Sequence, residues 1–297
     1  MKIGVVFPQT EIGPDPAVVL DFAQGVEEAR FDYLLAYDHV LGATHDREPR
    51  LTGPYDQDSL FHEPLVLFGY LAAATSRIEL VTGVLILPQR QTALVAKQAA
   101  EVDLLSGGRL RLGVGVGWNY VEYEALDEAF HNRGRRQEEQ VELLRQLWRE
   151  PVLDYVGEHH RIDRAGILPR PDREIPIWFG GFVPAAYARA ARLGDGFIYG
   201  GSARDAAEAL AVTLRDVEAA GRERATFGAE LIMMGDDLDD LEHWVEEVRV
   251  WRAAGGTHVS LVTMGCGLPD APAHLAAARR FRQAVVDAGL CEGEVGA

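Results

Sequence analysis

Strand-like and helix-like segments alternate regularly from one end of this chain to the other. Short strand-like runs at residues 3–7, 33–37 and 110–114 are each followed by a segment with helical spacing, and the pattern continues to residues 259–262 and 273–288. The strands read as buried on both faces rather than alternating, as in parallel strands that helices cover. Eight strand–helix pairs in 297 residues predict an α/β protein, a (β/α)8 TIM barrel, rather than a doubly wound sheet.

The domain organisation follows from what separates these pairs. No Pro- or Ser-rich linker and no shift in composition divides the sequence, so we expect a single domain over residues 1–297. Two segments are too long for simple connections. Residues 41–62 follow the second strand, at the end of the barrel where active sites lie. Residues 151–173 form an insertion segment between the fourth helix and the fifth strand, with a small hairpin expected at residues 155–162.

Composition excludes several functional classes. The chain has 46 acidic and 29 basic side chains, a net charge of −17, which argues against a nucleic-acid partner because such proteins need a basic surface. No uncharged apolar run approaches the ~18 residues of a membrane helix, and the first apolar run is too short for a signal peptide. Two cysteines, Cys266 and Cys291, make neither a disulfide framework nor a metal cluster. The sequence therefore predicts a cytoplasmic protein without a metal, a membrane partner or a nucleic-acid partner.

A glycine-rich segment, GVGVGWN at residues 113–119, follows the fourth strand. It is not the dinucleotide fingerprint, because Trp118 stands where G-x-G-x-x-G needs its last glycine. Glycines spaced by two allow a flat ligand to approach one face of a strand end. Two interpretations remain open, a ligand surface or a tight strand exit packed against neighbouring barrel layers.

The segment Gly180-Gly181-Phe182 leaves the fifth strand and enters a helix with Pro184 near its first turn. The start of that helix presents unpaired N–H groups, and the two glycines allow an anion to approach them. Barrel enzymes often bind phosphate in this way at a late strand. We therefore favour an anion site over a turn that merely needs glycine for its backbone angles.

Two further segments lie where strands end. Asp38 and His39 follow the second strand, where a histidine can donate a hydrogen bond or transfer a proton; the alternative is a structural pair that holds the next loop. Thr82, Gly83 and Val84 interrupt a β-branched strand, which indicates a bulge or a close approach to a ligand. The alternative for Gly83, a glycine that only makes room for barrel packing, is equally compatible with the sequence.

Three separated motifs resemble motifs of the bacterial luciferase-like monooxygenase superfamily and follow one another in the order found there. They are residues 85–118, residues 175–197 and Tyr37-Asp38-His39. The phrases LLSGGRL and ARLGDGF are most similar to the branch that uses coenzyme F420, a deazaflavin. The resemblance spans nearly the whole chain and implies a barrel with one insertion segment, a flavin or deazaflavin at the C-terminal rim, and a homodimer through barrel helices.

The resemblance also implies roles for individual residues. Asp38 and His39 would lie along the ring system, and Thr82, Gly83 and Val84 would form a bulge behind it, where family members often hold a non-prolyl cis peptide. Val116, Gly117 and Trp118 would border the ring or its ribityl chain. Gly180, Gly181 and Phe182 would contact the phosphate.

One departure from the superfamily bears on the substrate. Its sugar-phosphate dehydrogenases place a glutamate where Trp118 stands and a tryptophan where Ala43 stands. An indole offers one donor and a flat apolar surface, and it cannot act as acid or base. The resemblance therefore implies a less polar or planar substrate.

Three hypotheses about function follow. The first is an oxidoreductase that transfers a hydride between coenzyme F420 and an unidentified small organic substrate, with His39 as proton donor or ring-polarising group. The second is an FMN-dependent monooxygenase that takes reduced flavin from a partner reductase. The third is a flavin-binding barrel without catalytic activity.

Overall fold

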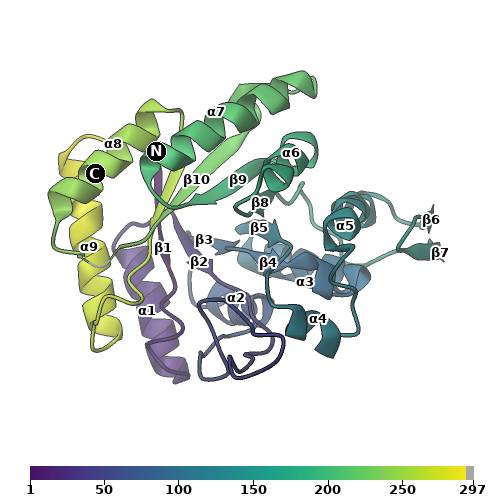
Figure 1. Ribbon diagram of the computed structural model, residues 1–297, viewed down its shortest axis with the longest axis horizontal. Helices are drawn as coiled ribbons and strands as arrows, with labels where there is room; N and C mark the ends of the chain where they lie inside the picture. Colours follow the sequence, from purple (N-terminus) through teal and green to yellow (C-terminus); the bar gives the residue numbers. More distant parts are fainter. Residues whose placement is uncertain (236, 292–297) are drawn as a thin grey trace.

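The centre of the molecule is a closed barrel of parallel strands, described by a computed structural model over residues 1–235 and 237–291 (Figure 1). In order around the ring, the strands are β1 (Lys2–Val6), β2 (Tyr33–Ala36), β3 (Glu79–Thr82), β5 (Leu110–Gly115), β8 (Ile177–Gly180), β9 (Gly196–Gly200), β10 (Gly228–Met233) and β11 (His258–Leu261). Strand β1 pairs with β2 and β11, and β3 pairs with β5, so the ring closes. The predicted (β/α)8 TIM barrel is confirmed.

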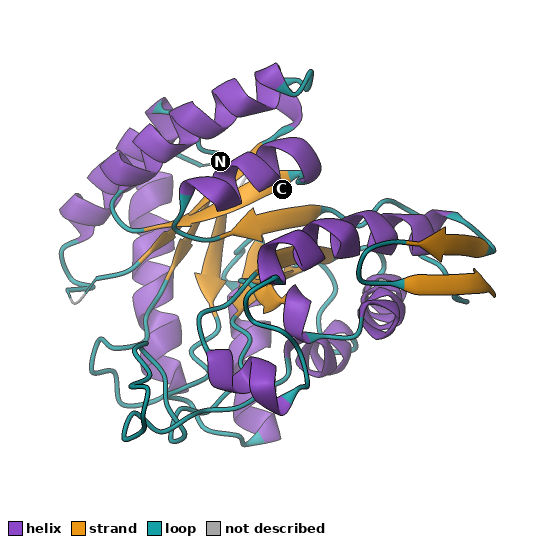
Figure 2. Ribbon diagram, turned by 45° about the vertical axis from the view of Figure 1, so that its right-hand side comes forward, coloured by secondary structure: helices purple, strands orange, loops and turns teal. Residues whose placement is uncertain are grey.

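Helices follow the barrel strands and cover the outside of the ring (Figure 2). They are α1 (Pro16–Glu28), α2 (Pro64–Ala72), α3 (Thr92–Ser106), α5 (Arg133–Arg149), α6 (Pro184–Leu193), α7 (Ala203–Ala219), α8 (Leu241–Ala253) and α9 (Ala271–Asp287). Local signals set several boundaries. Asp15 caps the start of α1, where its side chain accepts a hydrogen bond from the Ala17 amide and Pro16 is the first helical residue. Ser202 caps the start of α7, and Gly107 ends α3 with a φ of 71°.

The barrel strands are buried on both faces, as their largely apolar sequences indicate. Their outward side chains pack against the helices in the larger hydrophobic cluster. A smaller cluster fills the interior of the ring and includes Leu35, Val81 and Ile232. The interior is thus a packed core, which leaves the rim loops to form a ligand site.

A buried ion pair lies within the ring, near the N-terminal ends of the strands. The Arg111 guanidinium lies 2.7 Å from Glu230 and 3.2 Å from Glu79. Its carbon lies 4.7 Å from the ring centre of Tyr33 and 4.3 Å from that of Trp178. These partners compensate a buried charge at this end of the barrel, opposite the rim on which the candidate site lies.

The segment between α5 and β8 carries the expected hairpin, with β6 (Leu153–Val156) antiparallel to β7 (Arg161–Ala165) and Tyr155 opposite Ile162. It projects from the side of the barrel (Figure 2). His160 joins it to the helices, because its Nε2 lies 2.7 Å from Thr92 Oγ1 and its Nδ1 lies 2.8 Å from Glu139.

The strand that Thr82, Gly83 and Val84 were expected to interrupt divides into β3, β4 (Leu85–Ile86) and the 3-10 turn Leu87–Gln89. A non-prolyl cis peptide joins Gly83 and Val84, as the resemblance implied. A short helix, α4 (Tyr120–Ala125), follows β5 and was not predicted. Another 3-10 turn, Arg224–Thr226, precedes β10. Helix α4 matters for function because it lies beside His39.

Candidate active site

His39 lies at the C-terminal end of β2, within a group of aromatic side chains that we call the rim cluster: His39, Tyr55, Phe61 and Trp118. The centre of the His39 ring lies 4.8 Å from that of Phe61, 5.3 Å from that of Tyr55 and 5.5 Å from that of Trp118, all edge to face. The His39 side chain is 10% exposed. The structure therefore brings together two residues predicted for the site, His39 and Trp118, and adds two from the loop at residues 41–62.

Glu122 on α4 also belongs to this site, and the sequence did not predict it. Its carboxylate oxygens both lie 3.3 Å from His39 Nδ1, and Oε1 accepts hydrogen bonds from the amides of Val40 at 2.7 Å and Leu41 at 3.0 Å. The side chain is 2% exposed. Its position in a helix of only six residues, too short for a periodic pattern, gave no signal in the sequence.

The loop at residues 41–62 is fastened to the segment that follows β5. Asn119 caps α4 and donates through Nδ2 to the Leu41 carbonyl at 3.2 Å, and the Tyr120 hydroxyl donates to the Pro49 carbonyl at 2.7 Å. Gly53 lies directly against the Trp118 indole. The loop therefore folds over the rim and supplies part of the wall around His39.

Asp38, next to His39, forms interactions within the protein. It lies 2.6 Å from Arg90 Nη2 and accepts from the Ile86 amide at 2.8 Å, while Arg90 also pairs with Glu63 at 2.8 Å. Burial raises the pKa of Asp38, and the charge of Arg90 opposes that shift. This pair supports the structural interpretation of Asp38, and its contact with a cofactor stays a prediction.

Val84 occupies the space that two strand-end glycines leave open. A Cβ atom on Gly115 would overlap Val84, and one on Gly180 would lie 2.7 Å from Val84 Cγ1. Thr82 donates through its hydroxyl to the Gly113 carbonyl at 2.7 Å. Of the two interpretations left open for the glycine spacing, packing between strand ends accounts for Gly113 and Gly115.

Val116 and Gly117 leave β5 toward Trp118. The Val116 carbonyl accepts a hydrogen bond from the Tyr123 hydroxyl at 2.7 Å. Gly117 has a φ of 63°, a left-handed conformation that favours glycine, and a Cβ there would lie 2.8 Å from Ile86 Cγ2. This turn directs Trp118 toward His39.

The predicted anion site lies at the start of α6. No side-chain hydrogen bond caps this helix, so its first N–H groups have no partner from a capping side chain. Gly181 has a φ of 151°, and the exposed ring of Phe182 lies over Gly200. The uncapped start of α6 beside Gly181 suits an anion, whereas Val84 fills the space at Gly180, and anion binding here stays a prediction.

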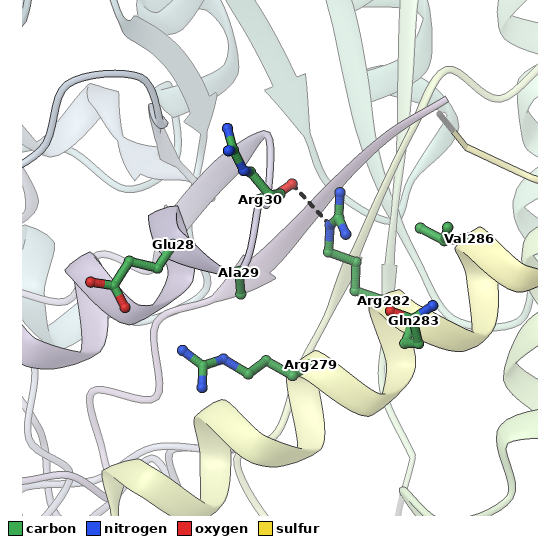
Figure 3. A pocket seen from close by; sticks show the side chains of 7 residues that line it. All are labelled: Glu28, Ala29, Arg30, Arg279, Arg282, Gln283 and Val286. Carbon is green, nitrogen blue, oxygen red and sulfur yellow. Dashed lines mark hydrogen bonds between the residues drawn. The ribbon is translucent and has the colours of Figure 1, made fainter. Parts of the chain in front are cut away.

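A hollow of about 460 Å³ lies elsewhere, between the C-terminal parts of α1 and α9 (Figure 3). Three of the residues lining it are arginines, Arg30, Arg279 and Arg282, and Arg282 Nε donates to the Arg30 carbonyl at 2.9 Å. Because α1 and α9 end beside the start of the barrel strands, this hollow lies at the end of the barrel opposite the rim cluster.

None of the helices in residues 1–235 and 237–291 has both the length and the hydrophobicity that crossing a bilayer requires. In the same residues, no group of three or more His, Cys, Asp or Glu side chains is arranged to hold a metal ion.

Comparison with known proteins places the chain among enzymes of one family. A family described as luciferase-like monooxygenase matches residues 1–255. The chain is 31% identical over 309 residues to F420-dependent hydroxymycolic acid dehydrogenase of Mycobacterium tuberculosis, covering 97% of this chain and 80% of that protein. It is 29% identical over 221 residues to FMNH2-dependent dimethylsulfone monooxygenase of Pseudomonas fluorescens, covering 73% and 57%.

A solved structure gives the same architecture. An F420-dependent secondary alcohol dehydrogenase in complex with an F420-acetone adduct aligns with a TM-score of 0.79 at 18% sequence identity, covering 96% of this chain and 98% of that one. The fold and the rim cluster define a class, a TIM-barrel enzyme with its site at the C-terminal ends of the strands. Within that class, the chain belongs to the luciferase-like monooxygenase family and is an oxidoreductase.

Proposed function

We propose that this protein transfers a hydride between coenzyme F420 and a small organic substrate bound beside His39. The relative of 31% identity that spans 97% of the chain is named for F420-dependent dehydrogenation. The observation that carries the proposal is the rim arrangement, in which an uncapped helix start at α6 and the His39 cluster stand on the same end of the barrel.

The residues present fit such a cofactor. Gly180 and Gly181 have no side chains, and the first N–H groups of α6 carry no side-chain cap, so the phosphate would bind there. Val84, Val116, Gly117 and Trp118 would border the ring with largely apolar surface. When bound, the deazaflavin supplies the hydride acceptor or donor.

The protein's own groups would prepare the substrate for that transfer. His39 Nε2 has no hydrogen-bond partner among the described residues, whereas Nδ1 is engaged by Glu122. Nε2 is therefore the atom free to bind the reacting polar group of a substrate. Tyr55, Phe61 and Trp118 enclose the imidazole and limit its contact with water, which strengthens such a hydrogen bond.

An FMN-dependent monooxygenase is the second candidate, supported by the 29% identity to an FMNH2-dependent enzyme. A phosphate site and an apolar ring site would serve either cofactor, since both have a tricyclic ring and a phosphate. In that case a partner reductase would supply the reduced flavin.

A paired titration tests the proposal. Each cofactor is added to the protein while tryptophan fluorescence is followed, because one of its five tryptophans, Trp118, lies in the rim cluster. We expect saturable quenching by F420 at lower concentration than by FMN. Tighter binding of FMN would replace the proposal with the monooxygenase, and oxygen consumption with reduced FMN would identify that activity. Binding of neither cofactor would contradict both.

A further inference from the structure

The contact between His39 and Glu122 determines more than the place of the ring. Glu122 Oε1 accepts from two backbone amides, Val40 N and Leu41 N, and both carboxylate oxygens lie 3.3 Å from His39 Nδ1. A carboxylate can only accept hydrogen bonds. The partner atom, His39 Nδ1, must therefore carry the proton.

The other ring nitrogen has the complementary role. A neutral imidazole has one N–H donor and one acceptor, so a proton on Nδ1 makes Nε2 the acceptor. Nε2 has no partner among the described residues, and it is not among the polar atoms that are sealed from solvent without a partner. It is thus the free, accessible atom of a ring whose other side is fixed.

We propose that Glu122 is a positioning residue that holds His39 in the Nδ1–H tautomer and so presents Nε2 to the site as a hydrogen-bond acceptor. The neutral ring then selects a ligand group that donates a hydrogen bond, such as an alcohol hydroxyl, over one that only accepts. This consequence for the ligand rests on the proposed oxidoreductase function, whereas the tautomer itself does not.

Helix α4 and the loop bonded to it hold His39 and Glu122 next to each other. Asn119 caps α4 and donates to the Leu41 carbonyl, so the helix that carries Glu122 is bonded to the same backbone turn that carries His39. Residues 39 and 122 are 83 positions apart and lie after different barrel strands. The contact is therefore a tertiary device that no local turn would produce.

The test reads the tautomer directly, by two-bond 1H–15N correlation spectra of 15N-histidine-labelled protein at a pH of about 8.5, where histidine is ordinarily neutral. The chain has nine histidines, so the His39→Gln variant assigns the signal. We expect the pattern of the Nδ1–H tautomer for His39 in the wild-type protein. A pattern showing the proton on Nε2 would overturn the proposal without any variant having to fold.

Glu122→Gln provides the sharper measurement. The amide oxygen can still accept from Val40 and Leu41, but its NH2 group faces Nδ1 and requires an unprotonated nitrogen, so the proton should move to Nε2. Glu124→Gln is the matched control, because Glu124 lies on the same helix and is exposed. An unchanged His39 pattern in a folded Glu122→Gln protein would contradict the proposal.

Kinetics then connect the tautomer to the reaction. With any alcohol substrate that is turned over, Glu122→Gln should lower kcat by about 100-fold or more while KM changes little, because binding surfaces are retained and the acceptor is lost. An equal loss in Glu124→Gln would show a merely structural effect. If the wild-type tautomer is Nδ1–H but F420 does not bind, the cofactor proposal fails and the role of Glu122 stands.

Discussion

Gly53 lies so close to the indole of Trp118 that a Cβ atom on residue 53 would overlap Cζ3 of the ring. Gly53 belongs to the loop at residues 41–62, and Trp118 follows β5, so this contact closes the wall around His39 from two distant parts of the sequence. Gly53 does not have a positive φ, so its backbone conformation does not require glycine. Glycine is needed there because the backbone of residue 53 lies so close to the indole.

Gly53→Ala should therefore displace the loop from Trp118. We expect a red shift of tryptophan emission and weaker cofactor binding, by several-fold, with a loss of about 1–3 kcal/mol in the free energy of unfolding from overpacking. Gly69→Ala on α2 is the control, because a Cβ there would meet no atom within 4 Å. Unaltered emission in Gly53→Ala would show that the loop does not rest on Trp118.

Trp118 should report cofactor binding. Trp118→Phe removes the indole nearest His39 but keeps an aromatic surface, so we predict that most of the fluorescence quenching by cofactor disappears while the affinity, measured by calorimetry, falls by less than about tenfold. Trp148, whose indole donates to the Ala96 carbonyl between α5 and α3, serves as control in Trp148→Phe. Equal quenching in the wild type and in Trp118→Phe would show that the cofactor ring does not bind beside residue 118.

The buried pair of Arg111 and Glu230 should be among the costliest to break. Glu230→Ala leaves the Arg111 guanidinium inside the barrel, paired with Glu79 alone among the acidic side chains that the structure describes. We expect a loss of about 3–5 kcal/mol in the free energy of unfolding, measured by urea denaturation. Glu246→Ala, which breaks an exposed pair with Arg249, should cost less than about 1 kcal/mol. Similar losses of unfolding free energy in Glu230→Ala and Glu246→Ala would contradict the prediction that the buried ion pair costs more to break than the exposed one.

His258 should make the fold sensitive to acid. Burial, and then the positive charge of Arg111, lower the pKa of His258 to about 2. An unfolded histidine has a pKa of about 6.5, so below that pH the unfolded chain binds a proton that the folded chain excludes. Stability present above pH ~6.5 is therefore lost as pH falls, by up to about 1.4 kcal/mol per pH unit.

His258→Gln should remove this contribution and flatten the decline of the unfolding free energy between about pH 6.5 and pH 4.5. His243→Gln, at an exposed position on α8, should leave the slope as in the wild type. Chemical denaturation across this range measures both. Parallel slopes for wild type and His258→Gln would rule out His258 as the source.

We propose that the expected homodimer forms through α2 and α3. These helices pack side by side and expose Val66, Tyr70 and Leu94. Apolar side chains grouped on adjacent helices are typical of an interface. The double variant Val66→Glu, Leu94→Glu should halve the mass found by light scattering, whereas Leu168→Glu, at an exposed leucine between α5 and β8, should not. A wild-type protein that is monomeric at micromolar concentration would contradict the proposal.

The candidate site was partly predictable from the sequence. His39 was predicted because it follows a strand, and the ends of parallel strands meet at one rim, whereas Trp118 was predicted from the family resemblance. Tyr55 and Phe61 lay in a loop whose importance was predicted but whose shape was not. Glu122 was missed because α4 has only six residues, too few for a periodic pattern.

The barrel follows from local patterns that are visible in the sequence. Apolar runs separated by helical periods can bury both faces only as parallel strands covered by helices, and local caps such as Asp15-Pro16 and Ser202 act within a single turn. The tertiary structure decided which rim groups meet: Glu122 with His39, Gly53 with Trp118, and Val84 with Gly115 and Gly180. These contacts depend on ring closure and on the course of long loops, which short-range spacing does not encode, because only the folded barrel brings residues so far apart in sequence within contact distance.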